Sequence, residues 1–413
     1  ESLAGELEAC GIERVDDPVA AELIVVNTCG FIADARAESI DTVLHYARYK
    51  DEGACRALAV VGCLVERYED ELREALPEVD LFAGVLNRDA LTRLARFASG
   101  SDRIRSAARH IRLTLPHSAY LRIADGCMNR CAYCTIPLIR GSLTSRPMEE
   151  VLADARQMAD EGVREVSVIA QDITSYGLDR GGRARLPELI AKLSETGIPW
   201  IRLMYLHPAN IDDELIDAIA AAPNVVRYLD IPVQHASTRI LRKMGRRIAR
   251  TKIERLLERL RRRLPGLFVR TTVLVGFPGE TKDDFRQAVD FVRDVRPERF
   301  GVFTYSDEED TRAIRMRNKV PAATATRRRR TLEELREEIV DELIESQQGQ
   351  LIECIVDASA GEAGAETAIG RTYGDAPEVD YRILIADKEV RPGDIVTCRV
   401  VGRAGNDLVG AVE

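Results

Sequence analysis

The sequence lacks any run approaching the ~18 apolar residues that a membrane-spanning helix needs. It also lacks the charged and then apolar leader of a secreted protein, so we predict a reducing, cytoplasmic compartment. The nine cysteines are an odd number and are not spaced as the disulfide framework of a small secreted domain. Clustered cysteines in a reducing compartment usually bind metal or take part in catalysis.

Neither sign of charge is in large excess. The chain has 59 Lys and Arg against 68 Asp and Glu, a net charge of −9, which disfavours a general nucleic-acid binder and suits a basic partner. Its 413 residues are too many for one ordinary core, so two or three domains are expected. The first residue is Glu1, and the residues after it are typical of a helix interior, so we expect the natural start to lie upstream.

Short apolar runs alternate with helical patterns in the first hundred residues. This alternation predicts a parallel α/β domain over residues 1–99. The predicted strands cover 22–29, 57–63 and 79–84, and the predicted helices cover 34–50, 66–75 and 88–98. The polar and basic residues 99–118 are interpreted as a linker or an edge strand.

A longer alternation begins at residue 119. Consecutive βα units with right-handed crossovers favour a parallel barrel or part-barrel, here with (β/α)6 organisation, in which chemistry takes place at the carboxyl ends of the strands. The predicted strands cover 119–125, 165–172, 200–206, 225–233, 268–276 and 299–306.

The C-terminal part has a different pattern. A charged helix is predicted over 323–347, and the Gly-rich residues 349–413 carry short β-patterned runs that predict a small antiparallel barrel. Residues 349–413 contain twelve Asp and Glu against six Lys and Arg, so this module is acidic.

The stretch "DGCMNRCAYCTIP" (125–137) places Cys127, Cys131 and Cys134 in a loop after the first of the six strands. Structural zinc usually takes four Cys or His ligands, and no fourth one lies close in the sequence. Buried core thiols are the other alternative, but the polar residues between these cysteines are unsuited to a core. A 4Fe–4S cluster held by three thiolates keeps one iron free of protein ligands, and that iron can bind the amino and carboxylate groups of S-adenosylmethionine.

The cysteine loop, together with "TIPLIRG" and "TSRP" after it, resembles the radical-SAM signature of the methylthiotransferases. The resemblance implies a methylthiotransferase domain over 1–99, a radical-SAM core over 113–346 and a TRAM domain over 347–413. Further matching motifs are "VNTCGFI" (26–32), "VVGCL" (60–64), "VIAQDITSYG" (168–177), "RLMYLHP" (202–208), "YLDIPVQHAS" (228–237), "KMGRR" (243–247), "TTVLVGFPGET" (271–281) and "FTYSDEEDT" (303–311).

The resemblance implies that Cys29 and Cys63, each at the end of a predicted strand, are ligands of an auxiliary 4Fe–4S cluster; two buried core cysteines are the alternative. The family's third ligand lies in a turn upstream of this chain's first residue, so the auxiliary cluster is expected to be incomplete here. Cys10 is interpreted as a bystander. The remaining cysteines are interpreted as structural, namely Cys55, Cys354 and Cys398.

Other residues are candidates to contact S-adenosylmethionine. Tyr133 would pack on adenine, and Arg246 would pair with the methionine carboxylate. A core aromatic or a structural cap at a strand end is the alternative for each. The remaining candidates are Gln171 and Asp172 for the ribose or amino group, Gln234 at the end of the fourth strand, and Gly276 for close backbone approach. Arg140 and Arg146 are candidates to meet an anionic substrate group, with a surface salt bridge as the alternative.

The family's reaction uses two molecules of S-adenosylmethionine, one as methyl donor and one as radical source, and an electron donor such as a flavodoxin-type reductant. The MiaB-like branch modifies adenosine in tRNA, and the other branch modifies an aspartate β-carbon in ribosomal protein uS12. Segments 62–80 and 370–385 resemble the uS12 branch. The acidic C-terminal module would repel RNA and attract a basic protein, so uS12 is the predicted partner and tRNA is disfavoured.

Overall fold

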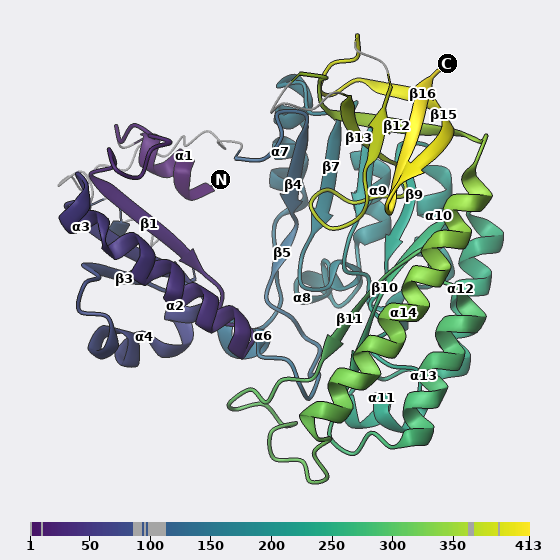
Figure 1. Cartoon of the computed structure of the whole chain (residues 1–413), viewed down its shortest axis with the longest axis horizontal. Helices are drawn as coiled ribbons and strands as arrows, with labels where there is room; N and C mark the ends of the chain where they lie inside the picture. The colour runs from purple at the N-terminus through teal and green to yellow at the C-terminus, as the bar shows by residue number, and fades with distance from the viewer. Residues whose placement is uncertain are drawn as a thin grey trace. The chain divides into compact units, whose positions relative to one another are not determined.

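The computed structural model describes residues 2–9, 11–85, 93–94, 96–97, 113–361, 367–386 and 389–413 (Figure 1). The chain forms two compact units. One combines Glu1–Leu113 with Tyr133–Ser142 and Ser306–Ile314, and the other contains Thr114–Ala132, Leu143–Tyr305 and Arg315–Glu413. Cys10 and most of the helix predicted over 88–98 lie outside the described residues. No helix in the described ranges is both long and apolar enough to cross a bilayer.

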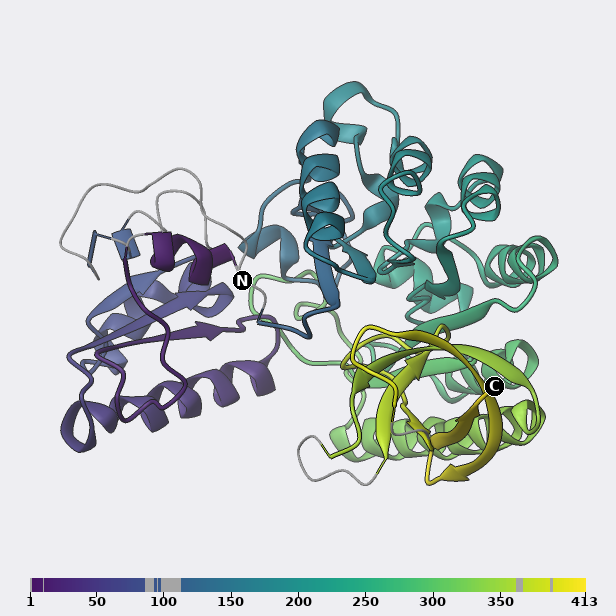
Figure 2. The same cartoon turned by 90° about the horizontal axis from the view of Figure 1, so that it is seen from above.

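The first unit contains a three-stranded parallel sheet in the order β1-β2-β3, which confirms the predicted parallel α/β domain. Its strands are β1 (Leu23–Thr28), β2 (Ala57–Gly62) and β3 (Leu81–Ala83). Its helices are α1 (Ser2–Ala9), α2 (Ala33–Ala47), α3 (Tyr49–Glu52) and α4 (Cys63–Ala75). Val60 packs with residues of α2 and α4, whereas Val61 packs with Leu3 of α1. Figure 2 shows α1 and α2 on opposite faces of the sheet. Apolar residues on both faces explain why these strands are continuous hydrophobic runs.

The second unit contains a six-stranded parallel sheet in the order β11-β10-β9-β8-β7-β4, which confirms the predicted (β/α)6 part-barrel. The strands are β4 (Ser118–Arg122), β7 (Glu165–Ile169), β8 (Trp200–Leu203), β9 (Val225–Asp230), β10 (Phe268–Val275) and β11 (Arg299–Thr304). The predicted first strand is interrupted after Arg122 and continues as β5 (Ala124–Asp125), which pairs with β6 (Thr144–Ser145). The longer crossover helices are α7 (Met148–Asp160), α9 (Leu186–Leu193), α10 (Asp213–Ala221), α12 (Arg250–Arg263) and α13 (Lys282–Val295).

Helix α13 shows how local sequence sets these boundaries. Thr281 and Asp284 form a reciprocal capping box that satisfies backbone N–H groups at the helix start. Ala288, Val292 and Val295 recur at helical spacing and are buried against the sheet. The helix therefore begins where the cap is available and lies with one apolar stripe on the core.

The C-terminal part comprises α14 (Ala322–Gln347) and a closed five-stranded barrel in the order β12-β13-β14-β16-β15. The strands are β12 (Leu351–Ala358), β13 (Ala368–Thr372), β14 (Ile383–Ile385), β15 (Ile395–Ala404) and β16 (Asp407–Val412). The predicted small barrel is confirmed, although β14 and β16 pair in parallel rather than antiparallel. Cys354 and Cys398 are fully buried inside it, and Cys55 is buried in the first unit.

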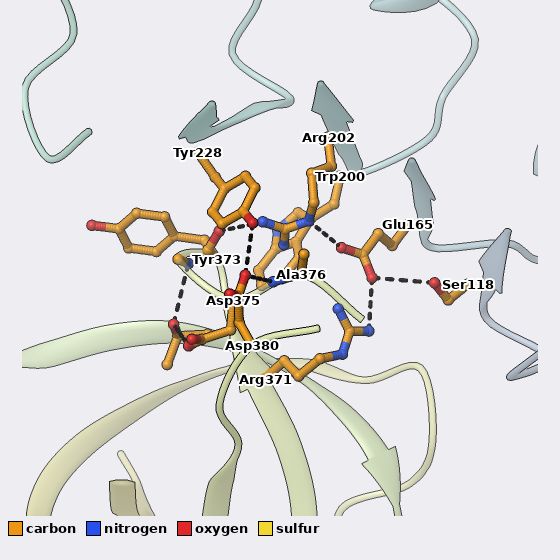
Figure 3. Close-up of polar contacts among 12 residues, drawn as sticks. Ser118, Glu165, Trp200, Arg202, Tyr228, Arg371, Tyr373, Asp375, Ala376 and Asp380 are labelled. Carbon is orange, nitrogen blue, oxygen red and sulfur yellow. Dashed lines mark hydrogen bonds and ion pairs between the residues drawn. The ribbon is translucent and has the colours of Figure 1, made fainter. Parts of the chain in front are cut away.

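A buried ion-pair network joins this barrel to the amino-terminal ends of the sheet strands (Figure 3). Glu165, the first residue of β7, lies 2.9 Å from Nε of Arg202 and 2.7 Å from Nη2 of Arg371 in β13. Arg371 also binds Asp357 at 2.7 Å, and Asp357 lies 3.0 Å from Nε2 of His117. The carboxylates thus balance guanidinium groups that burial would otherwise leave without a counter-charge.

Residues of the loop after β13 extend the same contact. The Tyr228 hydroxyl donates to Asp380 at 2.6 Å, and the Arg299 guanidinium binds Asp375 at 2.6 Å (Figure 3 labels both aspartates). The Trp200 indole N–H donates to Glu353 of β12 at 2.8 Å. The barrel therefore covers the beginnings of the strands, and the carboxyl ends remain for a functional site.

Candidate functional site

The predicted cofactor residues of the second unit follow successive strands of the sheet. Gln171 and Asp172 come after β7, Gln234 comes after β9 and Gly276 comes directly after β10. Because all these strands are parallel, their carboxyl ends meet at one edge of the sheet. His207, which sequence reasoning did not single out, follows β8 at the same edge.

The three-cysteine loop lies between β5 and α6 (Ile136–Ile139). Cys127, Cys131 and Cys134 form no disulfide within the described residues, and each is of intermediate exposure. Burial raises the pKa of the Cys127 thiol, and hydrogen bonds from Asn129 oppose this rise. The Asn129 backbone N–H lies 3.4 Å, and its side-chain Nδ2 3.5 Å, from the Cys127 sulfur. A metal bound at Cys127 would therefore displace the thiol proton, and the two N–H groups of Asn129 would donate to the resulting thiolate.

Asp172 attaches this loop to the end of β7. Its buried carboxylate accepts from Asn129 Nδ2 at 2.7 Å and from the Ser175 hydroxyl at 2.8 Å. It also accepts from the Thr174 backbone N–H at 3.0 Å. Asn129 was missed as a functional residue, and its only sequence signal is its place between two cysteines of the motif. The predicted contact between Asp172 and S-adenosylmethionine stays a prediction.

Gln171 Oε1 and Arg246 Nε are among the buried polar atoms at this edge that have no hydrogen-bond partner within the described residues. Arg246 donates through Nη2 to the Pro232 carbonyl oxygen. Buried polar groups normally have a partner. The amino and carboxylate groups of S-adenosylmethionine supply a donor for the Gln171 oxygen and an acceptor for Arg246, so the two residues fit this cofactor.

Burial and the nearby Arg246 charge lower the pKa of His207 to about 4, so the ring is neutral at physiological pH. Between pH 6.5 and pH 4 the unfolded chain binds a proton at this residue and the folded chain does not. Stability is therefore expected to fall on acidification, by about 3 kcal/mol for His207.

The free energy of unfolding is measured with denaturant at pH 7 and at pH 4.5. The loss between these two pH values should be larger in the wild type than in His207→Gln. The exposed His45 provides the matched control, since His45→Gln should leave the pH profile of the wild type unchanged. An unchanged profile for His207→Gln would refute the prediction.

Gln234 and Gly276 both have left-handed backbone conformations, with φ of 70° and 80°. The Gln234 backbone bonds to Thr272 O and Leu274 N, each at 2.7 Å, which holds it against β10. A Cβ added at Gly276 would lie 2.7 Å from Cβ of Ala325 in α14. Close helix packing is therefore sufficient to explain this glycine, and its predicted role beside a cofactor stays a prediction.

In the first unit, Cys29 and Cys63 lie at the carboxyl ends of two paired strands. Thr28 and Gly62 are register partners, and each cysteine directly follows one of them. Cys63 is the first residue of α4, and not the last residue of a strand as predicted, because Gly62 (φ 104°) turns the chain there. A Cβ at Gly30 would lie 2.6 Å from the Cys63 carbonyl oxygen, so the two cysteine-bearing turns are in contact.

Side chains around these turns fix both cysteines. The Ser39 hydroxyl accepts from the Cys29 N–H at 3.0 Å, and Arg67 donates to the Gly30 carbonyl at 3.1 Å. Arg140 lies with Nη2 3.7 Å from the Cys63 sulfur.

Arg146, the other candidate for an anionic substrate, makes a 2.8 Å salt bridge with Asp154. Tyr133 is half-buried, and its packing on adenine stays a prediction. No three His, Cys, Asp or Glu side chains in the described ranges converge on a single metal-ion position. A 4Fe–4S cube instead distributes its thiolates over different irons, and the assignment of cluster ligands also stays a prediction.

Comparison with known families defines the class of protein. Residues 121–292, which include the cysteine loop and strands β7 to β10, match the Radical SAM superfamily. Residues 1–84 match the uncharacterized protein family UPF0004, and residues 349–412 match the TRAM domain. In fold, the chain is similar to the radical S-adenosylmethionine methyltransferase TsrM from Kitasatospora setae (TM-score 0.51, 17% identity, 69% of this chain and 62% of that chain).

Several relatives match along the whole chain under the name ribosomal protein uS12 methylthiotransferase RimO. The relative from Anaeromyxobacter sp. (strain K) is 42% identical and aligns over 100% of this chain and 90% of its own length. The relative from Lachnoclostridium phytofermentans is 39% identical over 100% and 96%, and that from Chlorobium luteolum is 42% identical over 100% and 94%. This chain belongs to the RimO family. The prediction of a radical-SAM methylthiotransferase is thereby confirmed, and the superfamily implies a 4Fe–4S cluster and S-adenosylmethionine.

Proposed function

We propose that this protein adds a methylthio group to the β-carbon of an aspartate in ribosomal protein uS12, giving 3-methylthioaspartate. The observation that carries the proposal is the full-length match to the uS12 branch of the methylthiotransferases. The second candidate, a MiaB-like tRNA adenosine methylthiotransferase, is not favoured by these relatives.

Cys127, Cys131 and Cys134 are the proposed ligands of the radical-SAM cluster. Their spacing, their partial exposure and the N–H donors that Asn129 directs at Cys127 support this role. When bound, the cluster supplies the electron that cleaves S-adenosylmethionine to a 5′-deoxyadenosyl radical. Asn129, held by Asp172, would orient the Cys127 thiolate, since groups behind a ligand fix its direction and basicity.

Arg246 and Gln171 are the proposed contacts for the methionine part of S-adenosylmethionine, because each has a buried atom without a protein partner in the described residues. The cofactor would satisfy these atoms on binding, and His207 would stay uncharged beside Arg246. A neutral ring leaves the Arg246 charge available for the carboxylate.

Cys29 and Cys63 are proposed ligands of an auxiliary 4Fe–4S cluster. Their place after paired strands, and the Arg140 cation beside Cys63, support the proposal. Gly30 and Gly62 permit the close approach of the two turns.

The substrate assignment also agrees with charge. The C-terminal barrel segment has twelve acidic and six basic residues, which opposes RNA binding by this module and attracts a basic ribosomal protein. We place the reaction in the cytoplasm with a flavodoxin-type electron donor.

Mass spectrometry of uS12 and of bulk tRNA, after anaerobic reaction with the reconstituted protein, tests the proposal. A methylthio group on a uS12 aspartate, with unmodified tRNA adenosine, is expected. Modified tRNA with unchanged uS12 would overturn the assignment.

Asp172→Ala is expected to lower the rate of 5′-deoxyadenosine formation about 10- to 100-fold, because Asn129 loses the carboxylate that aims it at Cys127. The reduction potential of the cluster should shift as well, since hydrogen bonds to cluster sulfur tune it. An EPR-monitored redox titration measures this potential. Asp179→Ala is a matched control, because Asp179 bonds to Ser145 and not to the cysteine loop. Equal potentials in wild type and Asp172→Ala would contradict the role.

A further inference from the structure

A cavity of about 290 Å³ lies between α12 and the segment that follows β8. Its wall includes apolar groups such as Ile211 and Leu256. Four cationic side chains line it as well, namely Arg247, Lys252, Arg255 and Arg259. So many cations around one concavity are characteristic of an anion-binding site.

Few carboxylates neutralise these four cations. Arg247, Lys252 and Arg255 are exposed and form no ion pair within the part of the chain that the structure describes. Arg259 lies 3.4 Å from Asp213, but its Nε is buried without a hydrogen-bond partner among the described residues. Three other arginines of α12 form ion pairs with carboxylates that do not line the cavity. Arg250 binds Glu254 and Asp294, Arg261 binds Glu298, and Arg263 binds Asp217.

The positive charge is concentrated at this place in an otherwise acidic protein. Helix α12 has seven Lys and Arg against two Glu, whereas the whole chain has a net charge of −9. The cavity also borders the candidate site, because Pro208 and Ala209 follow His207 and Arg247 follows Arg246. An anion bound here would therefore lie beside the edge at which S-adenosylmethionine is proposed to bind.

We propose that this cavity binds phosphate groups of ribosomal RNA when the enzyme meets uS12 in an assembled small ribosomal subunit. The choice of occupant rests on the proposed function, since an assembled ribosomal protein is surrounded by RNA phosphate. Guanidinium groups bind phosphate with paired N–H donors, and such contacts position a protein without reading sequence. The acidic barrel and the basic cavity would then have separate partners, the first a basic protein and the second RNA.

A few phosphate contacts alone give weak binding at physiological salt, because each contributes through counterion release. Joined to the contact with uS12, they raise the local concentration of enzyme at its substrate. The cavity should therefore matter for assembled subunits and not for isolated uS12.

The test compares Lys252→Gln/Arg255→Gln with the control pair Arg329→Gln/Arg330→Gln, which removes two exposed arginines paired with Glu333 and Glu334 in α14. With unmodified small subunits, kcat/KM of the first variant is expected to fall about tenfold, and the slope of log affinity against log salt to become shallower by about two. With isolated uS12, both variants should match the wild type.

Binding is also measured by fluorescence anisotropy with a labelled RNA duplex at low salt, with ATP and inorganic phosphate as competitors. The proposal would be overturned if both variants bound the RNA duplex as well as the wild type, or if both lost the same affinity for it. It would also be overturned if the protein bound ATP or phosphate but not the RNA duplex. The RNA arm needs no cluster and no turnover. If neither the wild type nor the variants modified uS12, whether isolated or in the small subunit, the proposed function would fail. The RNA-binding measurement would still decide the role of the cavity.

Discussion

Replacement of Cys131 by alanine is expected to reduce 5′-deoxyadenosine formation to background. Cys131 is the middle member of a loop whose three cysteines are the proposed cluster ligands. Two thiolates cannot hold the cluster with one iron open, so both the reductive cleavage and the methylthiolation of uS12 should stop. Chromatography of the reaction mixture and iron analysis of the purified protein measure the two losses.

Cys55→Ala is the matched control for this experiment, because Cys55 is a buried cysteine far from the loop in sequence. It should keep its iron and its activity, at the cost of some stability. Continued release of 5′-deoxyadenosine by Cys131→Ala would remove the basis for the proposed radical chemistry at this loop.

Glu165→Ala is expected to destabilise the second unit by about 3–5 kcal/mol, because it leaves the buried Arg202 and Arg371 guanidiniums without their shared carboxylate. Glu188 is a matched control, since it also lies between two cations, Arg185 and Lys192, but is exposed. Glu188→Ala should cost only about 0–1 kcal/mol. Denaturant unfolding measures both differences, and equal effects would show that burial of the pair is unimportant.

The Glu165 effect has a defined dependence on pH. Burial alone would raise the pKa of Glu165, but the Arg371 and Arg202 charges outweigh burial and hold it below its ordinary value. A lowered carboxyl pKa contributes stability above the ordinary value of about 4.3, and this contribution is lost as the pH falls. The difference between wild type and Glu165→Ala should therefore be largest at neutral pH and should shrink below pH 4.

The individual strands and the cysteine loop could be predicted because each depends on residues close in sequence. The apolar runs of β1, β2 and β10 identify buried parallel strands directly, and the three-cysteine spacing is contained in ten residues. The turn at Gly62 was harder to predict, because only its positive φ shows that the strand ends before Cys63.

Contacts between distant segments could not be predicted. Glu165 and Arg371 are far apart in the chain, and a charged residue at the beginning of a strand is indistinguishable in sequence from an ordinary surface boundary. Asn129 had the same difficulty, since its role depends on Asp172 in a different βα unit. Burial and hydrogen bonding of polar groups are determined by tertiary structure, which periodicity does not encode.

The contact between the C-terminal barrel and the strand beginnings limits how these proteins can be recombined. Arg371 and Asp375 are matched to Glu165 and Arg299, so a barrel transplanted from a relative would need complementary charges on the recipient sheet. A chimera that exchanged the barrel alone would bury charged side chains without counter-charges where the barrel meets the sheet. Barrel and sheet should therefore be inherited, and engineered, as one electrostatically paired piece.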